Sequence, residues 1–254
     1  GWLAECRVCL SPGSGFDMLR LMLTKIFVLI GLTFAIQTFP TAAAELPPNM
    51  AMYQFVMLRA GTNHNQPAPE AQAKLQQEHL DGLIKLNREK VNLLFGPFTD
   101  NGDLRGIVVL DVPDADAARK ALAEDPYLKA GLMTLEIKPW YCETNHFFPP
   151  ETPHTPENLV FGFLMSGTNR MQLPAEEGQK IQSGHLAYMG ELHKQGKLLI
   201  AGPFGDNSSR RGLVIYRVKT VAEAKELAAG DPAVKAGRLA IDARPWMTFK
   251  GILK

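Results

Sequence analysis

Hydrophobic positions between residues 52 and 138 predict strands and helices in alternation. Four short apolar runs are typical of β-strands: residues 52–58, 91–95, 106–112 and 132–138. After the first run, apolar residues and one histidine recur at helical spacing: Leu75, His79, Leu83 and Leu86. Asp114 is a suitable N-cap for a second helix over 115–124, which Asp125-Pro126 should end. The predicted order is therefore β-α-β-β-α-β.

The same pattern returns 106 positions later. The recurring residues include His79 and His185, Gly96-Pro97-Phe98 and Gly202-Pro203-Phe204, Asp125-Pro126 and Asp231-Pro232, and Pro139-Trp140 and Pro245-Trp246. Because the offset is constant, the two copies align without a net insertion or deletion. A period this long is that of a whole small domain. The chain therefore carries two copies of one domain, copy 1 (residues 50–141) and copy 2 (residues 158–254), joined by a proline-rich linker over 142–157.

Each copy is expected to form an α+β domain of the ferredoxin-like type, with both helices on one face of a four-stranded antiparallel sheet. The strands carry apolar residues on both faces, so the second face of each sheet cannot rest in water. We therefore expect the two copies to pack together as a fused pseudo-dimer within one chain.

The first 44 residues predict an export signal rather than part of the fold. A basic start precedes an apolar run at 26–36, and small residues at 42–44 form a cleavage site without a lipid-bearing cysteine. The apolar run is shorter than the roughly 20 residues that span a bilayer. We expect translation to start at Met18 and cleavage to follow Ala44, which gives a periplasmic or secreted protein with no membrane contact.

Composition narrows the classes of partner. The 27 basic and 26 acidic residues are mixed along the chain and give a net charge of +1, which provides no field to attract nucleic acid. Cys6 and Cys9 have the Cys-x-x-Cys spacing of metal-binding and redox motifs, but they precede the expected translation start at Met18. The remaining chain holds only Cys142, so we expect no internal disulfide and stability from burial alone.

His79 and His185 are the main candidates for chemistry. Each interrupts an aliphatic helical stripe at the same place in its copy, and both should face the sheet. Histidine titrates near neutral pH and can act as an acid, a base or a ligand. The alternative is a core histidine held by a backbone carbonyl. Because the residue is kept in both copies, we weigh the two interpretations equally.

Two pairs of aspartates could orient these histidines. Asp125 and Asp231 stand before proline at a helix end, whereas Asp100 and Asp206 stand in the expected hairpin turn. Either pair could complete a His–Asp couple. Both positions are also ordinary turn chemistry, so the sequence leaves open which pair, if either, has this role.

Further candidates are kept in both copies. Arg105 and Arg211 could bind an anionic group of a substrate, although an arginine at a strand edge is often a solvated charge. Phe98 and Phe204 should lie in the core or in a substrate pocket. Neither histidine has the clustered ligands of a metal site, and no phosphate-binding glycine loop is present, so we expect no metal and no cofactor.

The order and spacing of these residues resemble the YCII-related domain family. Copy 1 shows the pattern as His79, Leu-Leu-x-Gly-Pro at 93–97, Asp100, Ala-x-Asp-Pro-Tyr-x-Lys-Ala-Gly at 123–131 and Pro139-Trp140. Copy 2 repeats the pattern but carries Ala233 where Tyr127 stands in copy 1. The cleft of copy 2 is therefore expected to differ.

The resemblance implies a dimeric α+β barrel with a cleft in each subunit that holds a His and Asp pair proposed as catalytic. Relatives of this barrel include muconolactone isomerase and a dehydrochlorinase of chlorinated hydroquinones, which transfer protons on small ring compounds. This suggests a cofactor-free lyase or isomerase for a small organic acid, lactone or ring compound. The alternative is a non-catalytic binding or structural protein whose histidines complete the core.

Overall fold

The computed structural model describes residues 46, 49–63, 67–169 and 171–254. The predicted export signal, its start at Met18, its cleavage site and Cys6 and Cys9 lie outside the described residues. In the part that the structure describes, no helix is long and apolar enough to cross a membrane.

Copy 1 forms one antiparallel sheet with the strand order β2-β3-β1-β4. Its elements are β1 (Met50–Ala60), α1 (Pro69–Arg88), β2 (Asn92–Pro97), β3 (Leu104–Leu110), α2 (Ala115–Ala121), α3 (Pro126–Lys129) and β4 (Met133–Glu143). The predicted order is confirmed, with a short extra helix, α3, after the second one. Asp125 explains this addition, because its side chain caps a new helix instead of only ending the previous one.

Copy 2 repeats the arrangement with the strand order β6-β7-β5-β8. Its elements are β5 (Pro156–Ser166), α4 (Ala175–Lys194), β6 (Leu198–Pro203), β7 (Arg210–Tyr216), α5 (Val221–Ala229), α6 (Pro232–Lys235) and β8 (Leu239–Phe249). The connecting segment holds a 3₁₀ turn, η1 (Thr144–His146). Gly131 and Gly237 follow α3 and α6 with φ of +67°, a left-handed conformation that glycine adopts without strain.

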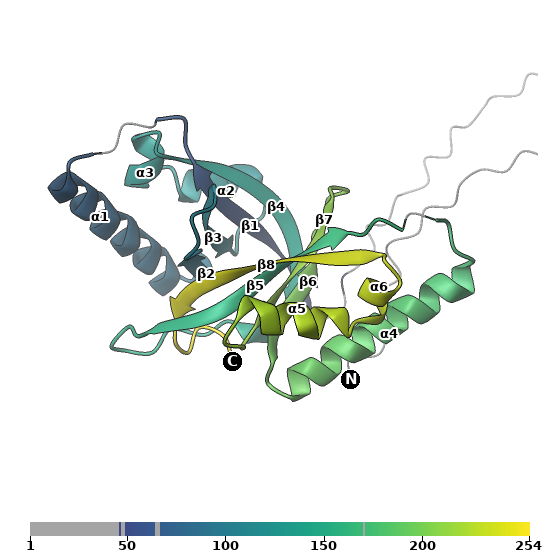
Figure 1. The fold of residues 1–254 in the computed structure, drawn as a ribbon. Coiled ribbons are helices and arrows are strands. Elements are labelled where there is room, and N and C mark those ends of the chain that lie inside the picture. Colours follow the sequence, from purple (N-terminus) through teal and green to yellow (C-terminus); the bar gives the residue numbers. More distant parts are fainter. Residues whose placement is uncertain (1–45, 47–48, 64–66, 170) are drawn as a thin grey trace, which may run out of the picture. The chain divides into compact units, whose positions relative to one another are not determined.

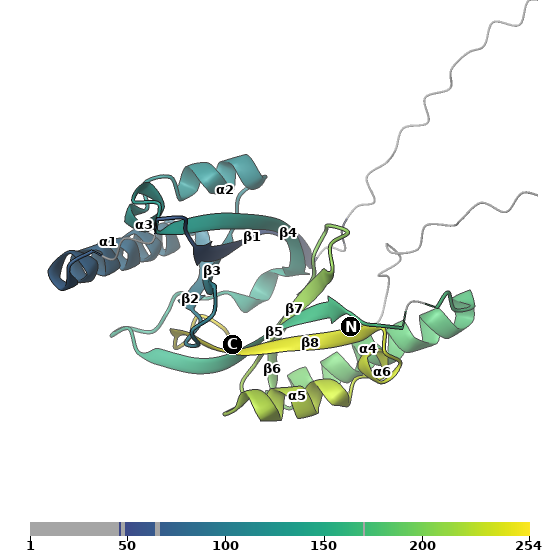
Figure 2. The same cartoon turned by 45° about the horizontal axis from the view of Figure 1, so that its top comes forward.

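The two copies pack sheet to sheet, and each keeps its helices on the outer face. Figures 1 and 2 show α1, α2 and α3 on one side, α4, α5 and α6 on the opposite side, and the two sheets between them. One hydrophobic core contains residues of both copies, among them Phe55 and Trp140 of copy 1 and Phe161 and Trp246 of copy 2. The Phe55 and Phe161 rings lie 5.9 Å apart. The expected pseudo-dimer is therefore confirmed.

The strand end Gly-Pro-Phe of each copy docks on the last strand of the other. The Trp246 side chain is fully buried, and its Nε1 donates a hydrogen bond of 2.9 Å to the carbonyl oxygen of Gly96. A Cβ at Gly96 would lie 1.9 Å from the carbonyl oxygen of Met247, so only glycine permits this approach. Trp140 contacts the equivalent strand end of copy 2 through a bridge between its backbone and that of Phe204. The retained Gly-Pro-Phe and Pro-Trp motifs therefore hold the copies together.

Candidate functional site

The structure pairs each helical histidine with the aspartate that precedes the proline. Nδ1 of His79 lies 2.5 Å from Oδ2 of Asp125, and Nδ1 of His185 lies 2.6 Å from Oδ2 of Asp231. His79 is 8% exposed and Asp231 is fully buried. The same couple is thus built at the same place in both copies.

Each aspartate has a second task. The other oxygen of Asp125 accepts hydrogen bonds from the backbone N–H groups of Tyr127 and Leu128, and that of Asp231 accepts one from Ala233 at 2.7 Å. The carboxylate therefore caps a short helix and also holds the histidine of the long helix. Because it occupies Nδ1, the nitrogen left for other partners is Nε2. Neither Nε2 atom bonds to any residue that the structure describes.

Tyr127 connects the couple of copy 1 to two glutamines of α1. Its ring meets the His79 ring edge to face at a centroid distance of 5.3 Å. Its hydroxyl donates to Oε1 of Gln76 at 3.1 Å and accepts from Nε2 of Gln72 at 3.0 Å. Burial, and then the charge of Asp125, raise the pKa of the Tyr127 hydroxyl, so it stays protonated at neutral pH.

A cleft of about 360 Å³ opens beside this cluster, at the end of the sheet between α1 and α3. Its polar lining comes from Asn63, Gln72, Gln76, Arg105 and Tyr127, and Leu132 and Met133 contribute apolar surface. Arg105 was predicted from the sequence as a binding residue, whereas the two glutamines were not. The signal was present, because positions 72, 76 and 79 share one face of a helix.

A sequence model of the YCII-related domain matches residues 53–141 and 163–247. The chain belongs to the YCII-related domain family. A search of curated proteins finds no match. Among solved structures, a haem-binding protein from Thermus thermophilus is similar, with 13% identity, a TM-score of 0.52 and coverage of 80% of this chain and 93% of that one. A candidate chlorite dismutase is also similar, with 9% identity, a TM-score of 0.52 and coverage of 77% and 93%. These likenesses show a shared fold, the dimeric α+β barrel.

The two YCII-related domains have diverged around their couples. In copy 2, Ala233 replaces the tyrosine, and two other tyrosines, Tyr188 and Tyr216, lie close enough to be influenced by the charge of Asp231. The Tyr188 hydroxyl donates to the carbonyl oxygen of Leu227 at 2.7 Å, whereas the buried Tyr216 hydroxyl has no partner among the described residues. Burial, and then the charge of Asp231, raise the pKa of both hydroxyls. Arg211 is half-buried in this copy, whereas Arg105 is exposed.

The turn aspartates of the YCII-related domains do not meet the histidines. Asp100 accepts two hydrogen bonds from Arg244 of the other copy, at 2.7 Å from Nε and 2.5 Å from Nη2. Asp206 accepts one from Lys138, at the position that corresponds to Arg244. The β2–β3 and β6–β7 turns lie where the two sheets meet, so these side chains cannot reach the helix side. The hypothesis that Asp100 and Asp206 orient the histidines is therefore wrong, because both side chains bond to residues of the other copy.

The phenylalanines also belong to the contact between the copies. Phe98 and Phe204 are each 6% exposed, and the Phe98 ring lies 5.5 Å from that of Phe161. Of the two expected locations, core or pocket, the structure places both in the core. They do not line the cleft, and their candidacy for substrate binding finds no support in this geometry.

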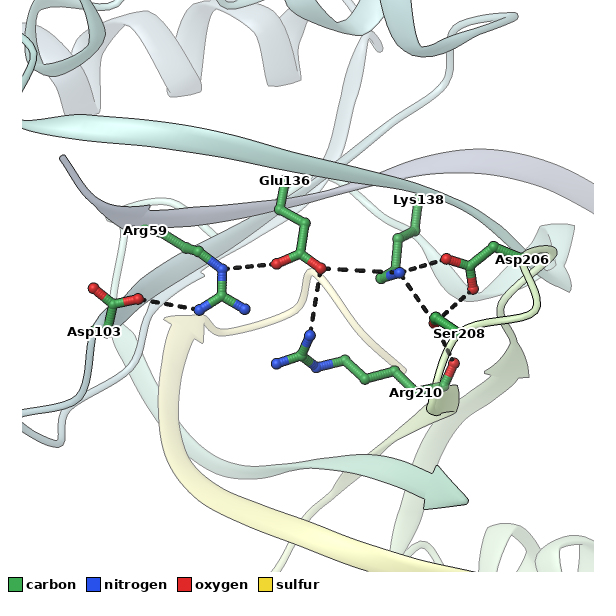
Figure 3. Close-up of polar contacts among 7 residues, drawn as sticks. All are labelled: Arg59, Asp103, Glu136, Lys138, Asp206, Ser208 and Arg210. Carbon is green, nitrogen blue, oxygen red and sulfur yellow. Dashed lines mark hydrogen bonds and ion pairs between the residues drawn. The ribbon is translucent and has the colours of Figure 1, made fainter. Parts of the chain in front are cut away.

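A chain of charges extends the contact on the Lys138 side (Figure 3). Glu136 accepts hydrogen bonds from Arg59 of its own copy at 2.7 Å and from Arg210 of copy 2 at 3.3 Å. Lys138, only 8% exposed, lies 3.9 Å from the same carboxylate. The His–Asp couple and the polar contact between copies therefore occupy opposite faces of each sheet.

Among the described residues, no group of three or more His, Cys, Asp or Glu side chains could hold a metal ion.

The cross-copy pair of Asp100 predicts an acid-sensitive contribution to stability. The hydrogen bonds from Arg244 hold the pKa of Asp100 below its ordinary value of 3.8. A carboxyl group with a lowered folded-state pKa stabilises the fold above its unfolded-state pKa and loses this contribution as the pH falls through the folded-state value. Asp100→Asn should therefore lower the melting temperature most at about pH 5–7, with the difference shrinking below about pH 4.

Thermal unfolding between about pH 2 and pH 7 measures this effect. Asp116→Asn, at an exposed position of α2, is the matched control and should follow the wild-type curve at every pH. A constant difference between Asp100→Asn and wild type across the whole range would contradict the assignment.

Proposed function

We propose that the protein is a cofactor-independent lyase or isomerase that uses its His–Asp couples for proton transfer on a small organic acid, lactone or ring compound. The observation that supports this is the couple itself, present in both copies with Nδ1 held by a carboxylate and Nε2 without a partner among the described residues. From its N-terminal sequence, we also propose that the protein acts after export, in the periplasm or outside the cell.

The geometry suits a general base. The carboxylate accepts the Nδ1–H bond, which leaves the lone pair of Nε2 for a proton taken from a C–H group next to a carbonyl. The resulting imidazolium would be stabilised by the same carboxylate, and Nε2 would return the proton to another atom of the substrate or to its leaving group. No redox partner is required, because no electrons are exchanged with the protein.

Haem is named for one protein of similar fold, but the residues around His79 do not suit it. A haem site requires a broad apolar slot beside an iron-ligating nitrogen. Here the cleft beside Tyr127 is lined by Gln72, Gln76 and Arg105, and the Tyr127 ring packs against His79. The residues on this side of copy 1 therefore do not fit haem.

The competing function is structural, and one observation favours it. Each aspartate caps a helix as well as holding its histidine, so the couple also fastens α3 to α1 and α6 to α4. Such a structural role would by itself explain why the couple is kept in both copies, even if the protein catalysed no reaction. The two functions therefore have to be separated by a measurement of proton transfer.

Hydrogen exchange into deuterated water tests the proposal even when the product is not identified. Unsaturated lactones, 2-oxo acids and hydroxy acids are incubated with the protein, and loss of their C–H signals is followed by NMR. We expect one class to exchange, and His79→Gln combined with His185→Gln to slow the exchange by about 10²–10⁴-fold. The structural function would be favoured if exchange persisted in the doubly substituted protein, or if none of the tested compounds exchanged.

A further inference from the structure

We propose that the cleft of copy 1 is a binding site for a small monocarboxylate, with Arg105 as the residue that anchors the carboxylate. The inference rests on the proposed function for its role as a substrate site, but binding can be measured without turnover. Four features carry it: the way the backbone directs Arg105, the charge of the lining, the neutral donors around Tyr127 and the difference between the copies.

A β-bulge places Arg105 on the helix side of the sheet. In the ladder between β1 and β3, Leu58 faces Gly106 and Arg59 faces Leu104, so Arg105 is the extra residue of the bulge. Bulges commonly redirect one side chain next to a functional site, and this one lies between the two inner strands of the sheet. In a regular strand, the side chain of Arg105 would point to the face opposite to that of its neighbours Leu104 and Gly106. The bulge explains why a strand arginine lines a cleft between helices.

Among the described residues of the lining, Arg105 is the charged one. Arg105 makes no ion pair or side-chain hydrogen bond with any residue that the structure describes, and the rest of the lining consists of uncharged residues. An arginine that lines a concave site and has no ion-pair partner among the described residues favours an anionic ligand, and its planar guanidinium matches a carboxylate with two parallel hydrogen bonds. A single cation suits a monoanion better than a doubly charged phosphate.

Size and the neutral donors define the rest of the ligand. A volume of about 360 Å³ is near the lower limit for small-molecule sites. The Tyr127 hydroxyl takes the Oε1 atom of Gln76 as its acceptor, so the NH₂ group of that amide is left for a ligand. Leu132 and Met133 offer apolar contact. The expected ligand is a small carboxylate with an apolar body.

Copy 2 cannot form the same site. Gly178 and Ala233 occupy the positions of Gln72 and Tyr127, so the amide–hydroxyl cluster has no counterpart. Arg238 replaces Leu132 and donates instead to the carbonyl oxygen of Met171 at 2.7 Å. The carboxylate site should therefore occur once per chain. Tyr127, which touches His79 and also lines the cleft, would place such a ligand next to one couple only.

Titration of the purified protein with benzoate, and with benzamide as its neutral isostere, tests the inference. By calorimetry or NMR, we expect saturable benzoate binding with one site per chain and at least tenfold weaker binding of benzamide. Arg105→Gln should weaken benzoate binding at least tenfold, and Tyr127→Ala should weaken it as well. Arg119→Gln, which removes an exposed arginine of α2, is the charge-matched control and should leave affinity unchanged.

Three results would overturn the inference: equal affinity for benzoate and benzamide, binding unaffected by Arg105→Gln, or no saturable binding of benzoate. Melting temperatures of all variants show whether a loss reflects unfolding. The proposed function fails separately, because it depends on hydrogen exchange that the double histidine substitution removes. Binding without exchange would keep the carboxylate site and reject proton transfer, and exchange with benzoate binding that is insensitive to Arg105→Gln would do the reverse.

Discussion

Trp246→Ala is expected to lower the free energy of unfolding by about 3–5 kcal/mol. The Trp246 ring is fully buried between the copies, 6.0 Å from the Phe161 ring, and its Nε1 bonds to the carbonyl oxygen of Gly96 in copy 1. Removal leaves a cavity at the centre of the shared core and a carbonyl without its donor. Urea unfolding followed by circular dichroism measures the change.

A pair of conservative variants separates the hydrogen bond from the packing. Trp246→Phe loses the bond to Gly96, whereas the buried Nε1 of Trp140 has no partner among the described residues, so Trp140→Phe loses none. Trp246→Phe should therefore be the more destabilising by about 0.5–1.5 kcal/mol. Equal effects would mean that the bond across the copies contributes nothing to stability.

Asp231→Ala is expected to cost about 2–4 kcal/mol of folding free energy. This substitution removes the partner of His185 and the cap of α6 together, and it does so at a fully buried position. A lost cap contributes about 0.5–2 kcal/mol, and a ring nitrogen left without its acceptor about 1–3 kcal/mol. Denaturant unfolding at neutral pH gives the value.

Asp231→Asn is the control for this prediction. The amide oxygen can still accept from the backbone N–H of Ala233, so the cap should survive and the loss should be smaller than for alanine. If Asp231→Ala changed stability by less than about 0.5 kcal/mol, the couple would not be a structural fastening, and its retention in both copies would have to be explained by chemistry.

Much of this fold was predictable because the chain repeats itself. The alternation of apolar runs and helical stripes appears twice at one offset, which separates retained positions such as His79 and His185 from their neighbours. The packing of the copies follows from apolar residues on both faces of the strands. The short helices α3 and α6 were missed because Asp125 and Asp231 each cap a new helix.

The choice between the two aspartate pairs could not be made from the sequence. A histidine on α1 meets Asp125 because α1 and α3 cover the same face of the sheet, and this depends on packing rather than on spacing. Asp100 lies in a turn whose neighbours come from the other copy. The pairing of Asp100 with Arg244 depends on how the two copies pack together, which the sequence does not give.

The cleft was only partly predictable, for a related reason. Arg105 was singled out as an anion-binding candidate because it is retained, but the bulge that directs it depends on the register of backbone hydrogen bonds and not on residue types. Tyr127 drew attention only as a difference between copies. Its hydrogen bonds to Gln72 and Gln76 depend on the rotation of α1 about its axis, which apolar periodicity leaves undetermined within one residue or so.

The shared core of the two copies has a consequence for how the protein responds to dilution. Residues of both halves meet in one hydrophobic cluster, and the halves belong to one chain. Two separate chains would fall apart as their concentration drops, by mass action, whereas here the partner is always present at the high local concentration that a short tether provides. Each half therefore has to match only the one surface to which it is tethered. The residues around the His–Asp couple of one half are therefore free to change while the other half keeps its own.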